Sequence, residues 1–473
     1  MKSRLTWFYY LLILATGILG VRLIYLQIFE GKYYQTLADE NRVKQKILPA
    51  ERGNIVDRFG EKLSLGEATG NVLGYTGEAD EAEAEQFYLG AIVGKTGLQA
   101  KYDQKLRGTD GVSIVEQDAN GQELRELKRI EPVRGEDLKT TLDAGLQNKA
   151  YELLNHRKGA VVASDPNTGE ILALVSSPGF DPKNLTKALN DKNLPMFNRA
   201  LGGEYPPGST FKVITAVGAL QEGTIDGQSQ LEDTGVITIG PYKYTNWYFT
   251  EYGKTDGWIN IVKALARSND VFFYQLGEKL GIAKMADWAK YFGFGTETGV
   301  DLGGEAKGLM PDPAWKKEVM KEDWYTGDTF ITAIGQGHVL ATPMQINQMM
   351  SIVASGGRLC QPHLASGVNC KKLDISQKTL DLVTEGLKQV CETGGTAWPF
   401  FDGKISVAGK TGTAEFGSDA KSEKGQTHAW FTGFAPTDKP QIVVTVLLEG
   451  AGEGSYQAAP VAKDLLTYWF ARE

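Results

Sequence analysis

The sequence predicts an α/β domain with a mostly antiparallel sheet over residues 141–473, preceded by a small β-rich module and an N-terminal apolar helix. Three observations predict this arrangement. Apolar runs at both ends of the long C-terminal region have the pattern of paired strands, amphipathic segments lie between them, and the chain begins with an apolar stretch. The 473 residues are 42% hydrophobic and 23% charged, which is ordinary for a globular protein of two or three domains.

The N-terminal segment indicates a membrane anchor. Lys2 and Arg4 precede an apolar stretch, residues 6–29, whose uncharged part covers the 16 residues 6–21. A membrane span needs about 20 residues, so the segment suffices only if the side chain of Arg22 extends to the far interface. The leading positive charges favour a cytoplasmic N-terminus, with the rest of the chain outside. A cleaved signal peptide is the alternative, and "LATGILG" offers it only a weak cleavage site.

Residues 30–140 are charged and turn-rich, which predicts the small β-rich module. Two β-type runs in it flank Ala119-Asn120-Gly121, a hairpin signal.

Charge and cysteine content narrow the function classes. A formal net charge of −8 argues against a nucleic-acid-binding protein. Cys360, Cys370 and Cys391 form no CxxC pair and the four histidines are scattered, so a zinc site is not expected. Cys360 and Cys370 could bridge a hairpin if the domain lies in an oxidising compartment. The alternative, three unrelated small hydrophobic residues, is equally compatible with the sequence.

The region after residue 140 alternates between strand and helix patterns. "GAVVASDPNTGEILALVSS" (159–177) predicts two apolar strands around an Asn-Thr-Gly turn, and "ISVAGKTGTAE", "HAWFTGFAP" and "PQIVVTVLLEG" predict three more. The predicted amphipathic helices cover 209–221, 258–281, 284–292, 343–354 and 376–392, with "APVAKDLLTYWFA" last.

Ser209 and Lys212 in "YPPGSTFK" are the candidate nucleophile and base. Side chains at i and i+3 of a helix face the same way. Two prolines pre-set the backbone that enters the helix and Gly208 permits a close approach, so Ser209 is predicted at the helix N-terminus, where free N–H groups favour an oxyanion. Lys212 can take the hydroxyl proton if burial lowers its pKa. The alternative is a serine cap with a solvated lysine. Ser418 and Lys421 also match SxxK, but their polar surroundings predict no helix.

Two further motifs complete the pattern. "KALARSNDVFFYQLG" supplies Ser268 and Asp270 ahead of an apolar helical run, although a helix with a polar break would look the same. "ISVAGKTGTAE" supplies a cation, two hydroxyls and a glycine that leaves room for a substrate at the strand edge: Lys410, Thr411, Thr413 and Gly412. Lys95-Thr96-Gly97 repeats the KTG triplet upstream and is treated as a coincidence. The order SxxK, Sx(N/D), KTG at 209, 268 and 410 carries the prediction.

Longer segments add to these motifs: "RGNIVDRFGEKL" (52–63), "VGKTGLQAKYDQKLRGTDG" (93–111), "FGFGTETGVDLGGEAKGLMP" (292–311) and "WYTGDTFITAIGQGHVLATPMQ" (324–345). With them, nearly the whole chain resembles the class B penicillin-binding proteins, the D,D-transpeptidases that cross-link peptidoglycan, and most of all the elongation type, penicillin-binding protein 2. The resemblance implies the penicillin-binding serine-transpeptidase fold: an antiparallel sheet flanked by helices, plus a helical subdomain. The implied boundaries are 1–29 for the anchor, 30–140 for a dimerisation-like pedestal and 141–473 for the transpeptidase.

The resemblance also implies roles. Ser209 resembles the acylated nucleophile, Lys212 its base, Ser268 the proton relay to the leaving amine, and Lys410 the cation that shapes the field around that relay. The second motif usually ends in Asn, and Asp270 is a variant that elongation-type members carry. An ionised carboxylate beside Lys212 would raise the lysine pKa, so the base would depend more on burial and on Lys410.

The substrate side follows in the same way. Thr411 and Thr413, on either side of Gly412, resemble the groups that hold the carboxylate of the substrate or of a β-lactam. The backbone N–H groups of Ser209 and Thr413 resemble the oxyanion hole. Some relatives carry a metal near the second motif, but residues 225–270 contain no His or Cys, so we expect neither metal nor cofactor.

The implied reaction is a two-step acyl transfer. Ser209 attacks the D-Ala–D-Ala bond of a stem peptide, D-Ala leaves, and a side-chain amine of a neighbouring stem attacks the acyl-enzyme; β-lactams acylate the serine and stay. The implied partners are a SEDS-family, Rod-type glycosyltransferase, since the residues before the transpeptidase are too few for such a domain, and a scaffold of the MreC type. The pedestal, residues 30–140, is shorter than in larger members of the class, which leaves little room for contact with an MreC-type scaffold.

Rival functions share parts of the pattern. A serine β-lactamase or D,D-carboxypeptidase has the same three motifs but lacks the 52–63 signature. A membrane sensor with a penicillin-binding ectodomain, or a structural activator of a partner glycosyltransferase, would need no catalysis. A division-type class B transpeptidase is disfavoured by Asp270 and "WYTGD".

Overall fold

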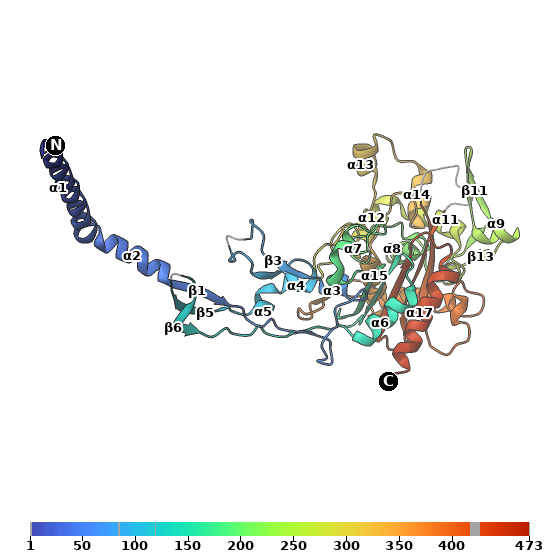
Figure 1. Ribbon diagram of the computed structural model, residues 1–473. Coiled ribbons are helices and arrows are strands. Elements are labelled where there is room, and N and C mark those ends of the chain that lie inside the picture. Colours follow the sequence, from blue (N-terminus) through green and yellow to red (C-terminus); the bar gives the residue numbers. More distant parts are fainter. Residues whose placement is uncertain (1, 84–85, 119, 417–425, 473) are drawn as a thin grey trace. The chain divides into compact units, whose positions relative to one another are not determined.

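The computed structural model describes residues 2–83, 86–118, 120–416 and 426–472. It divides into two compact units, Met1–Gly53 with Gln104–Asp137, and Asn54–Asp103 with Leu138–Glu473. Figure 1 follows the chain through both units. The domain boundaries predicted from the sequence stay a prediction, because these units are discontinuous along the chain.

The first unit contains the apolar helix and a small sheet. Helix α1 (Lys2–Ile24) continues into a π-helical turn at Tyr25–Phe29. Within it, Leu5–Phe29 has a mean hydropathy of 2.0 and is long and apolar enough to cross a membrane, by length and composition. After α2 (Gly31–Arg42), three antiparallel strands form a sheet in the order β1-β5-β6: Val43–Leu48, Gly111–Gln117 and Glu123–Ile130. The predicted hairpin is therefore confirmed, although Ala119 lies outside the described residues.

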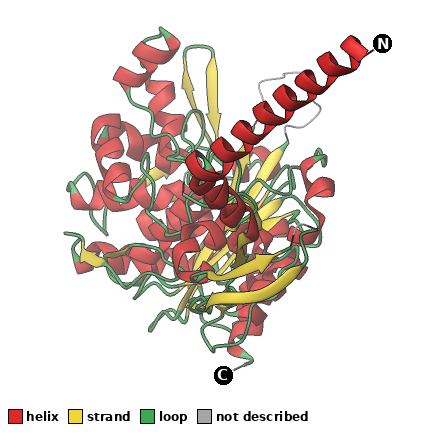
Figure 2. Ribbon diagram, turned by 60° about the vertical axis from the view of Figure 1, so that its left-hand side comes forward, coloured by secondary structure: helices red, strands yellow, loops and turns green. Residues whose placement is uncertain are grey.

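The second unit is built on a five-stranded sheet, drawn in yellow in Figure 2. Its order is β16-β17-β18-β8-β9 and every neighbouring pair is antiparallel, as the sequence predicts: Ala408–Glu415, Thr427–Ala435, Ile442–Leu448, Gly159–Ser164 and Ile171–Ser177. The predicted turn joins β8 to β9, and Gly169 within it has φ +83°, a left-handed conformation that favours glycine. Strand β16 lies at one edge of the sheet, so among the described residues only one of its sides pairs with a strand.

Helices bury both faces of this sheet. Helices α6 (Ala144–Leu154) and α17 (Gly454–Phe470) contact one face, and α15 (Pro343–Ala354) contacts strands β8, β17 and β18. Successive strand residues point to opposite faces, so Trp430 joins the core of the helical subdomain while Phe431 packs in the core that contains α6 and α17. Burial of both faces explains why every residue of β18 is buried and all but Thr445 are apolar.

A helical subdomain packs against the sheet. Its helices are α8, α10, α11, α12, α14 and α16: Lys212–Gln221, Ile261–Arg267, Asp270–Leu280, Ile282–Tyr291, Thr326–Ala333 and Gln377–Val390. The continuous helix predicted over 258–281 is wrong. The segment begins as strand β13 (Gly257–Ile259) and breaks at Ser268. The break arises because Asn260 and Asn269 each cap the helix that follows them, which ends the preceding element. Helix α14 is an addition that the sequence analysis did not contain.

Short elements complete the chain. The paired strands are β2 with β7, β3 with β4, β10 with β13, β11 with β12 and β14 with β15. Their ranges, in the same order, are Ile55–Val56, Leu138–Lys139, Thr76–Glu78, Ile92–Gly94, Leu231–Asp233, Gly257–Ile259, Val236–Ile239, Tyr242–Thr245, Arg358–Cys360 and Cys370–Lys372. The short helices are α3, α4, α5, α7, α9 and α13: Gly70–Leu73, Gly97–Lys101, Asp103–Arg107, Leu185–Leu189, Trp247–Tyr252 and Pro313–Trp315.

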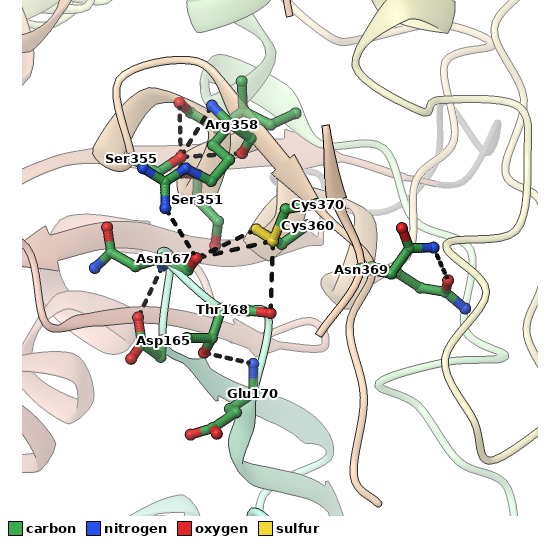
Figure 3. Close-up of a disulfide and its surroundings, with 12 residues drawn as sticks. Asp165, Asn167, Thr168, Glu170, Ser351, Ser355, Arg358, Cys360, Asn369 and Cys370 are labelled. Atoms are coloured by element: carbon green, nitrogen blue, oxygen red, sulfur yellow. Dashed lines mark hydrogen bonds between the residues drawn. A yellow bond between two sulfur atoms is a disulfide. The ribbon is translucent and has the colours of Figure 1, made fainter. Parts of the chain in front are cut away.

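A disulfide joins the β14–β15 hairpin. Cys360 and Cys370 lie directly opposite each other and are bonded, while Cys391 is free and buried. Figure 3 shows this hairpin against the β8–β9 turn, where an Nη of Arg358 donates to the carbonyl of Asn167 at 3.3 Å. Of the two interpretations left open by the sequence, the hairpin bridge is the correct one.

The disulfide should contribute measurably to stability. Replacing both residues in Cys360→Ala/Cys370→Ala removes a cross-link with a sequence separation of 10. We expect the free energy of unfolding to fall by about 2–3 kcal/mol, because the unfolded chain gains conformational freedom. Denaturant unfolding with and without reductant measures this: the wild type should respond to reductant and the double variant should not. Cys391→Ala is the matched control and should keep the response, whereas a wild type indifferent to reductant would contradict the prediction.

Candidate active site

Ser209 lies in a tight turn that leads into α8. Gly208–Phe211 form a 3₁₀ turn and the α-helix begins at Lys212. The serine therefore precedes the α-helix, whereas the sequence predicted it as the first helical residue. The difference follows from Gly208, whose φ of +53° turns the backbone before the helix can begin. Ser209 is half-buried, and Lys212 is fully buried.

The turn lies against strand β16. A Cβ on Gly208 would be 2.8 Å from the carbonyl oxygen of Thr413, and a Cβ on Gly412 would be 3.0 Å from Cγ2 of Thr210. On its other side, the N–H of Gly208 donates to the carbonyl of Gly335 at 2.8 Å. Glycines therefore let the SxxK turn and the KTG strand, about 200 residues apart in the chain, come into backbone contact.

The amino group of Lys212 is held by the second motif. Its Nζ donates to the carbonyl oxygen of Ser268 at 2.8 Å, to the Ser268 hydroxyl at 3.3 Å and to Oδ1 of Asp270 at 2.6 Å. Burial lowers the pKa of Lys212 because desolvation disfavours the ammonium form, while the Asp270 carboxylate acts in the opposite direction. Burial has the larger effect, so the lysine is shifted toward the neutral form that a base requires.

Ser268 occupies the junction between α10 and α11. Its φ of +52° is left-handed, which is uncommon for a residue with a side chain. In this conformation both its carbonyl and its hydroxyl reach the same lysine. Asp270 is the first residue of α11, and its side chain is partly exposed. The polar break in this segment is therefore the feature that positions both side chains.

Lys410 is the second buried cation. It lies on β16 opposite Thr432, is 0% exposed, and donates from Nζ to the carbonyl of Thr411 at 3.1 Å. Burial and the charge of Lys212 lower the pKa of Lys410 well below its ordinary value, and the Asp270 carboxylate opposes this. The Asp270 carboxylate therefore raises the pKa of both lysines against the effect of burial.

The backbone C=O and N–H groups of Thr413 face away from the neighbouring strand β17. The Thr413 carbonyl accepts a hydrogen bond from Nε2 of Gln336 at 3.2 Å and lies near Gly208. The N–H and C=O of one residue in an antiparallel strand point to the same side, so the N–H of Thr413 also faces away from β17. This amide is on the side of the SxxK turn, as an oxyanion donor would have to be.

The structure brings all three motifs together around the Ser209 turn, and the upstream KTG triplet has different neighbours. Lys95 pairs with Glu83, and Gly97 packs against the backbone of Val72 and Gly74. Ser418 and Lys421 lie outside the described residues.

Two side chains of the site were not singled out by the sequence analysis. Gln336 braces the Thr413 carbonyl, and the hydroxyl of Thr396 lies 2.6 Å from that of Thr411. Gln336 stands between two left-handed glycines, so the Gly-Gln-Gly triplet is a signal that could have found it. Thr396 has no comparable local signal.

The described part of the chain contains no group of three or more His, Cys, Asp or Glu side chains placed to hold a metal ion. Asp233, a buried carboxylate from the 225–270 segment, accepts N–H donors on both oxygens. The residues present there do not fit the metal site of the relatives that have one, and no step is derived through a metal.

Comparisons with known proteins agree with this geometry. Residues 159–467 match the family model "Penicillin binding protein transpeptidase domain", and 62–140 match "Penicillin-binding Protein dimerisation domain". The peptidoglycan D,D-transpeptidase MrdA of Acinetobacter baumannii is 37% identical over 445 residues, which is 85% of this chain and 65% of that protein. The chain thus spans slightly less than two thirds of that relative's length.

Solved structures give the same result. A complex of penicillin-binding protein 2 and MreC from Helicobacter pylori has a TM-score of 0.81 at 28% identity, covering 91% of this chain and 99% of that chain. A second structure, described as "Structural coordination of polymerization and crosslinking by a peptidoglycan synthase complex", has a TM-score of 0.80 at 29% identity, covering 100% of this chain and 99% of that chain. With these matches and the three motifs in one place, the chain belongs to the penicillin-binding protein transpeptidases, a family of serine acyl-transfer enzymes.

Proposed function

We propose that this protein is an elongation-type peptidoglycan D,D-transpeptidase that uses Ser209 as its nucleophile. The observation that carries the proposal is the buried amino group of Lys212, one helical turn after Ser209 and hydrogen-bonded to Ser268 and Asp270. A desolvated lysine beside a serine at a tight turn is an arrangement that activates a hydroxyl for acyl transfer.

In the first step, Ser209 Oγ attacks the carbonyl of the D-Ala–D-Ala bond while Lys212 takes its proton. The N–H groups of Ser209 and Thr413 stabilise the oxyanion. The C–N bond then breaks, and the proton passes from Lys212 through the Ser268 hydroxyl, 3.3 Å away, to the departing D-Ala amine. Lys410, on strand β16, shapes the electrostatic field around this path.

In the second step, an amine of a neighbouring stem peptide attacks the acyl-enzyme and restores Ser209. The unpaired edge of β16 can pair with an extended donor peptide, as edge strands do. Thr411 and Thr413 offer hydroxyls to its terminal carboxylate, and the 2.6 Å contact from Thr396 fixes the Thr411 hydroxyl. Gly412 points to the opposite face of β16, where a Cβ would be 3.0 Å from Cγ2 of Thr210, so its role is to admit the SxxK turn.

The location of the substrate supports an anchored enzyme. We propose that Leu5–Phe29 is a single membrane anchor with the transpeptidase on the outer side of the cytoplasmic membrane, where the lipid-linked glycan is made. The H. pylori protein is described in complex with MreC, and a second relative in a peptidoglycan synthase complex. We propose equivalent partners here, a SEDS-type glycosyltransferase and an MreC-type scaffold.

Penicillin should label one residue. Mass spectrometry of the intact protein and its peptides after penicillin treatment is expected to show a single adduct, on Ser209. Ser209→Ala should abolish it. Lys212→Ala should slow its formation by about 10²–10⁴-fold, the usual contribution of a general base.

Two controls sharpen this test. Ser418→Ala, in the other SxxK match, should leave the adduct unchanged. Lys410→Ala should slow its formation, whereas Lys95→Ala, in the other KTG match, should not. An adduct that survives Ser209→Ala refutes the assignment. Rapid release of hydrolysed penicillin would instead favour a β-lactamase, and cell shape restored by Ser209→Ala would favour a structural role.

The rate of acylation should depend on pH through Lys212. Only the neutral amine accepts a proton, so acylation rises as pH rises through the lysine pKa. Asp270 raises that pKa against the effect of burial, so Asp270→Asn should move the acid limb of the profile to lower pH. The pH dependence of the acylation rate constant with penicillin measures the shift. Asp328→Asn, which removes one of the two carboxylate partners of another buried lysine, Lys316, should leave the limb in place. A shift to higher pH for Asp270→Asn would contradict this argument.

A further inference from the structure

The residues around Ser268 form a polar cluster that the mechanism does not use. Four segments meet there: the β10–β13 ribbon, the start of α9, the end of α10 and the start of α11. At its centre is Asp233, which is 2% exposed, whereas the carboxylate bonded to Lys212 is that of Asp270. A buried carboxylate is costly unless its oxygens accept hydrogen bonds, so its partners indicate what it holds in place.

Both oxygens of Asp233 are occupied by N–H donors. Oδ2 accepts from Nδ2 of Asn269 at 2.8 Å, from the backbone N–H of Asp256 at 2.8 Å and from Nδ2 of Asn246 at 3.1 Å. Oδ1 accepts from the backbone N–H of Gly235 at 2.9 Å. Two of these donors belong to side chains that are themselves 0% exposed, Asn246 and Asn269. The carboxylate therefore joins, by hydrogen bonds, four parts of the chain that are separate in sequence.

These side chains hold the backbone on the C-terminal side of Ser268. Asn269 follows the serine directly, caps the N–H of Phe272 at 2.9 Å and donates to Asp256 at 3.2 Å as well as to Asp233. Oδ1 of Asn246 accepts the N–H of Asp270 at 3.3 Å. The residue after Ser268 and the one after that are thus both fixed by partners of Asp233.

The N-terminal side is held by the same cluster. Arg267 donates from Nε to Asp256 at 3.1 Å, and its carbonyl accepts from Nε1 of Trp247 at 2.9 Å. Its guanidinium also lies over the Trp247 ring, 5.0 Å from the centroid. Ser268 therefore lies between Arg267 and Asn269, both of which are held by hydrogen bonds to this cluster.

We propose that Asp233 is a positioning residue that, through Asn269, Asn246 and Asp256, holds Ser268 in its left-handed conformation beneath Lys212. The inference rests on the proposed function, because it concerns the serine that relays the proton. A left-handed φ of +52° is disfavoured for serine and persists only where surrounding contacts impose it. Relaxation of this residue would withdraw both its carbonyl and its hydroxyl from the lysine.

The test separates positioning from stability by two measurements on the full-length protein. They are the rate constant of acylation at saturating penicillin (k2) and the apparent dissociation constant for penicillin (K). Asp233→Asn keeps the shape but turns an N–H group toward donors. Asn269→Ser keeps the capping capacity for Phe272 and loses the reach to Asp233. We expect k2 to fall by about tenfold or more in each, since a buried hydrogen bond to a charged group is lost, while K changes little. Arg267 is left intact because it also donates to the Gly394 carbonyl, close to Thr396.

The matched control is Asp301→Asn. Asp301 is a buried carboxylate that accepts three backbone N–H groups, from Leu364, Ala365 and Ser366, and is not a partner of Ser268 or its neighbours. Its replacement should lower the unfolding midpoint comparably and leave k2 unchanged. If Asp233→Asn does not fold, Asn269→Ser decides the question.

A double-mutant cycle completes the experiment. Because Asp233 acts on Ser268 partly through Asn269, the two losses should overlap, and Asp233→Asn/Asn269→Ser should lose clearly less k2 than the product of the single losses. The inference is overturned if folded Asp233→Asn acylates as fast as Asp301→Asn, or if the two losses multiply. A wild type that is not acylated on Ser209 would instead overturn the proposed function itself.

Discussion

The site depends on removing one amino group from water. Lys212 is fully buried, and its three hydrogen bonds go to only two residues, Ser268 and Asp270. Without burial the lysine would stay protonated near neutral pH and could not accept the serine proton. Without its partners the amine would be an unsatisfied buried group, which costs free energy. The second motif is therefore as necessary to the base as the helix that carries it.

This requirement explains why two distant backbones approach so closely. The helix α8 supplies the lysine, the α10–α11 junction supplies its partners, and β16 must close the third side to exclude water. Glycine at 208 and 412 permits that closure, since a Cβ at Gly208 would lie 2.8 Å from the Thr413 carbonyl. The same closure buries Lys410, whose charge then lowers the chance that both lysines are protonated together.

Sequence patterns were sufficient for features encoded by neighbouring residues. Alternating apolar strands, the Asn-Thr-Gly turn at β8–β9 and the order of three short motifs predicted the antiparallel sheet and the candidate site. The SxxK helix was placed one turn too early, because Gly208 imposes a 3₁₀ turn that helical periodicity does not reveal. The disulfide was one of two open interpretations, since spacing alone does not show that Cys360 and Cys370 face each other.

Features built from distant residues were not predictable in this way. Asp233 and Asn269 are 36 positions apart, and neither belongs to a recognisable spacing. The middle residue of "SND" was passed over because the motif assigns chemistry only to the residues on either side of it. The role of Asn269 depends on tertiary contacts and not on a local pattern. The same holds for Thr396, whose hydroxyl lies beside that of Thr411.

The charges of the site explain why it tolerates Asp at 270. The Asp270 carboxylate raises the pKa of both buried lysines against the effect of burial, and it lies 2.6 Å from the amine of Lys212. When Lys212 takes the serine proton, it gains one positive charge while the oxyanion gains one negative charge, so the sum within the site does not change. The contacts of 2.6 and 2.8 Å from Asp270 and the Ser268 carbonyl stabilise the ammonium at that moment. They would also retain the proton afterwards, so the hydroxyl of Ser268 at 3.3 Å, which can both accept and donate, provides the route by which it leaves.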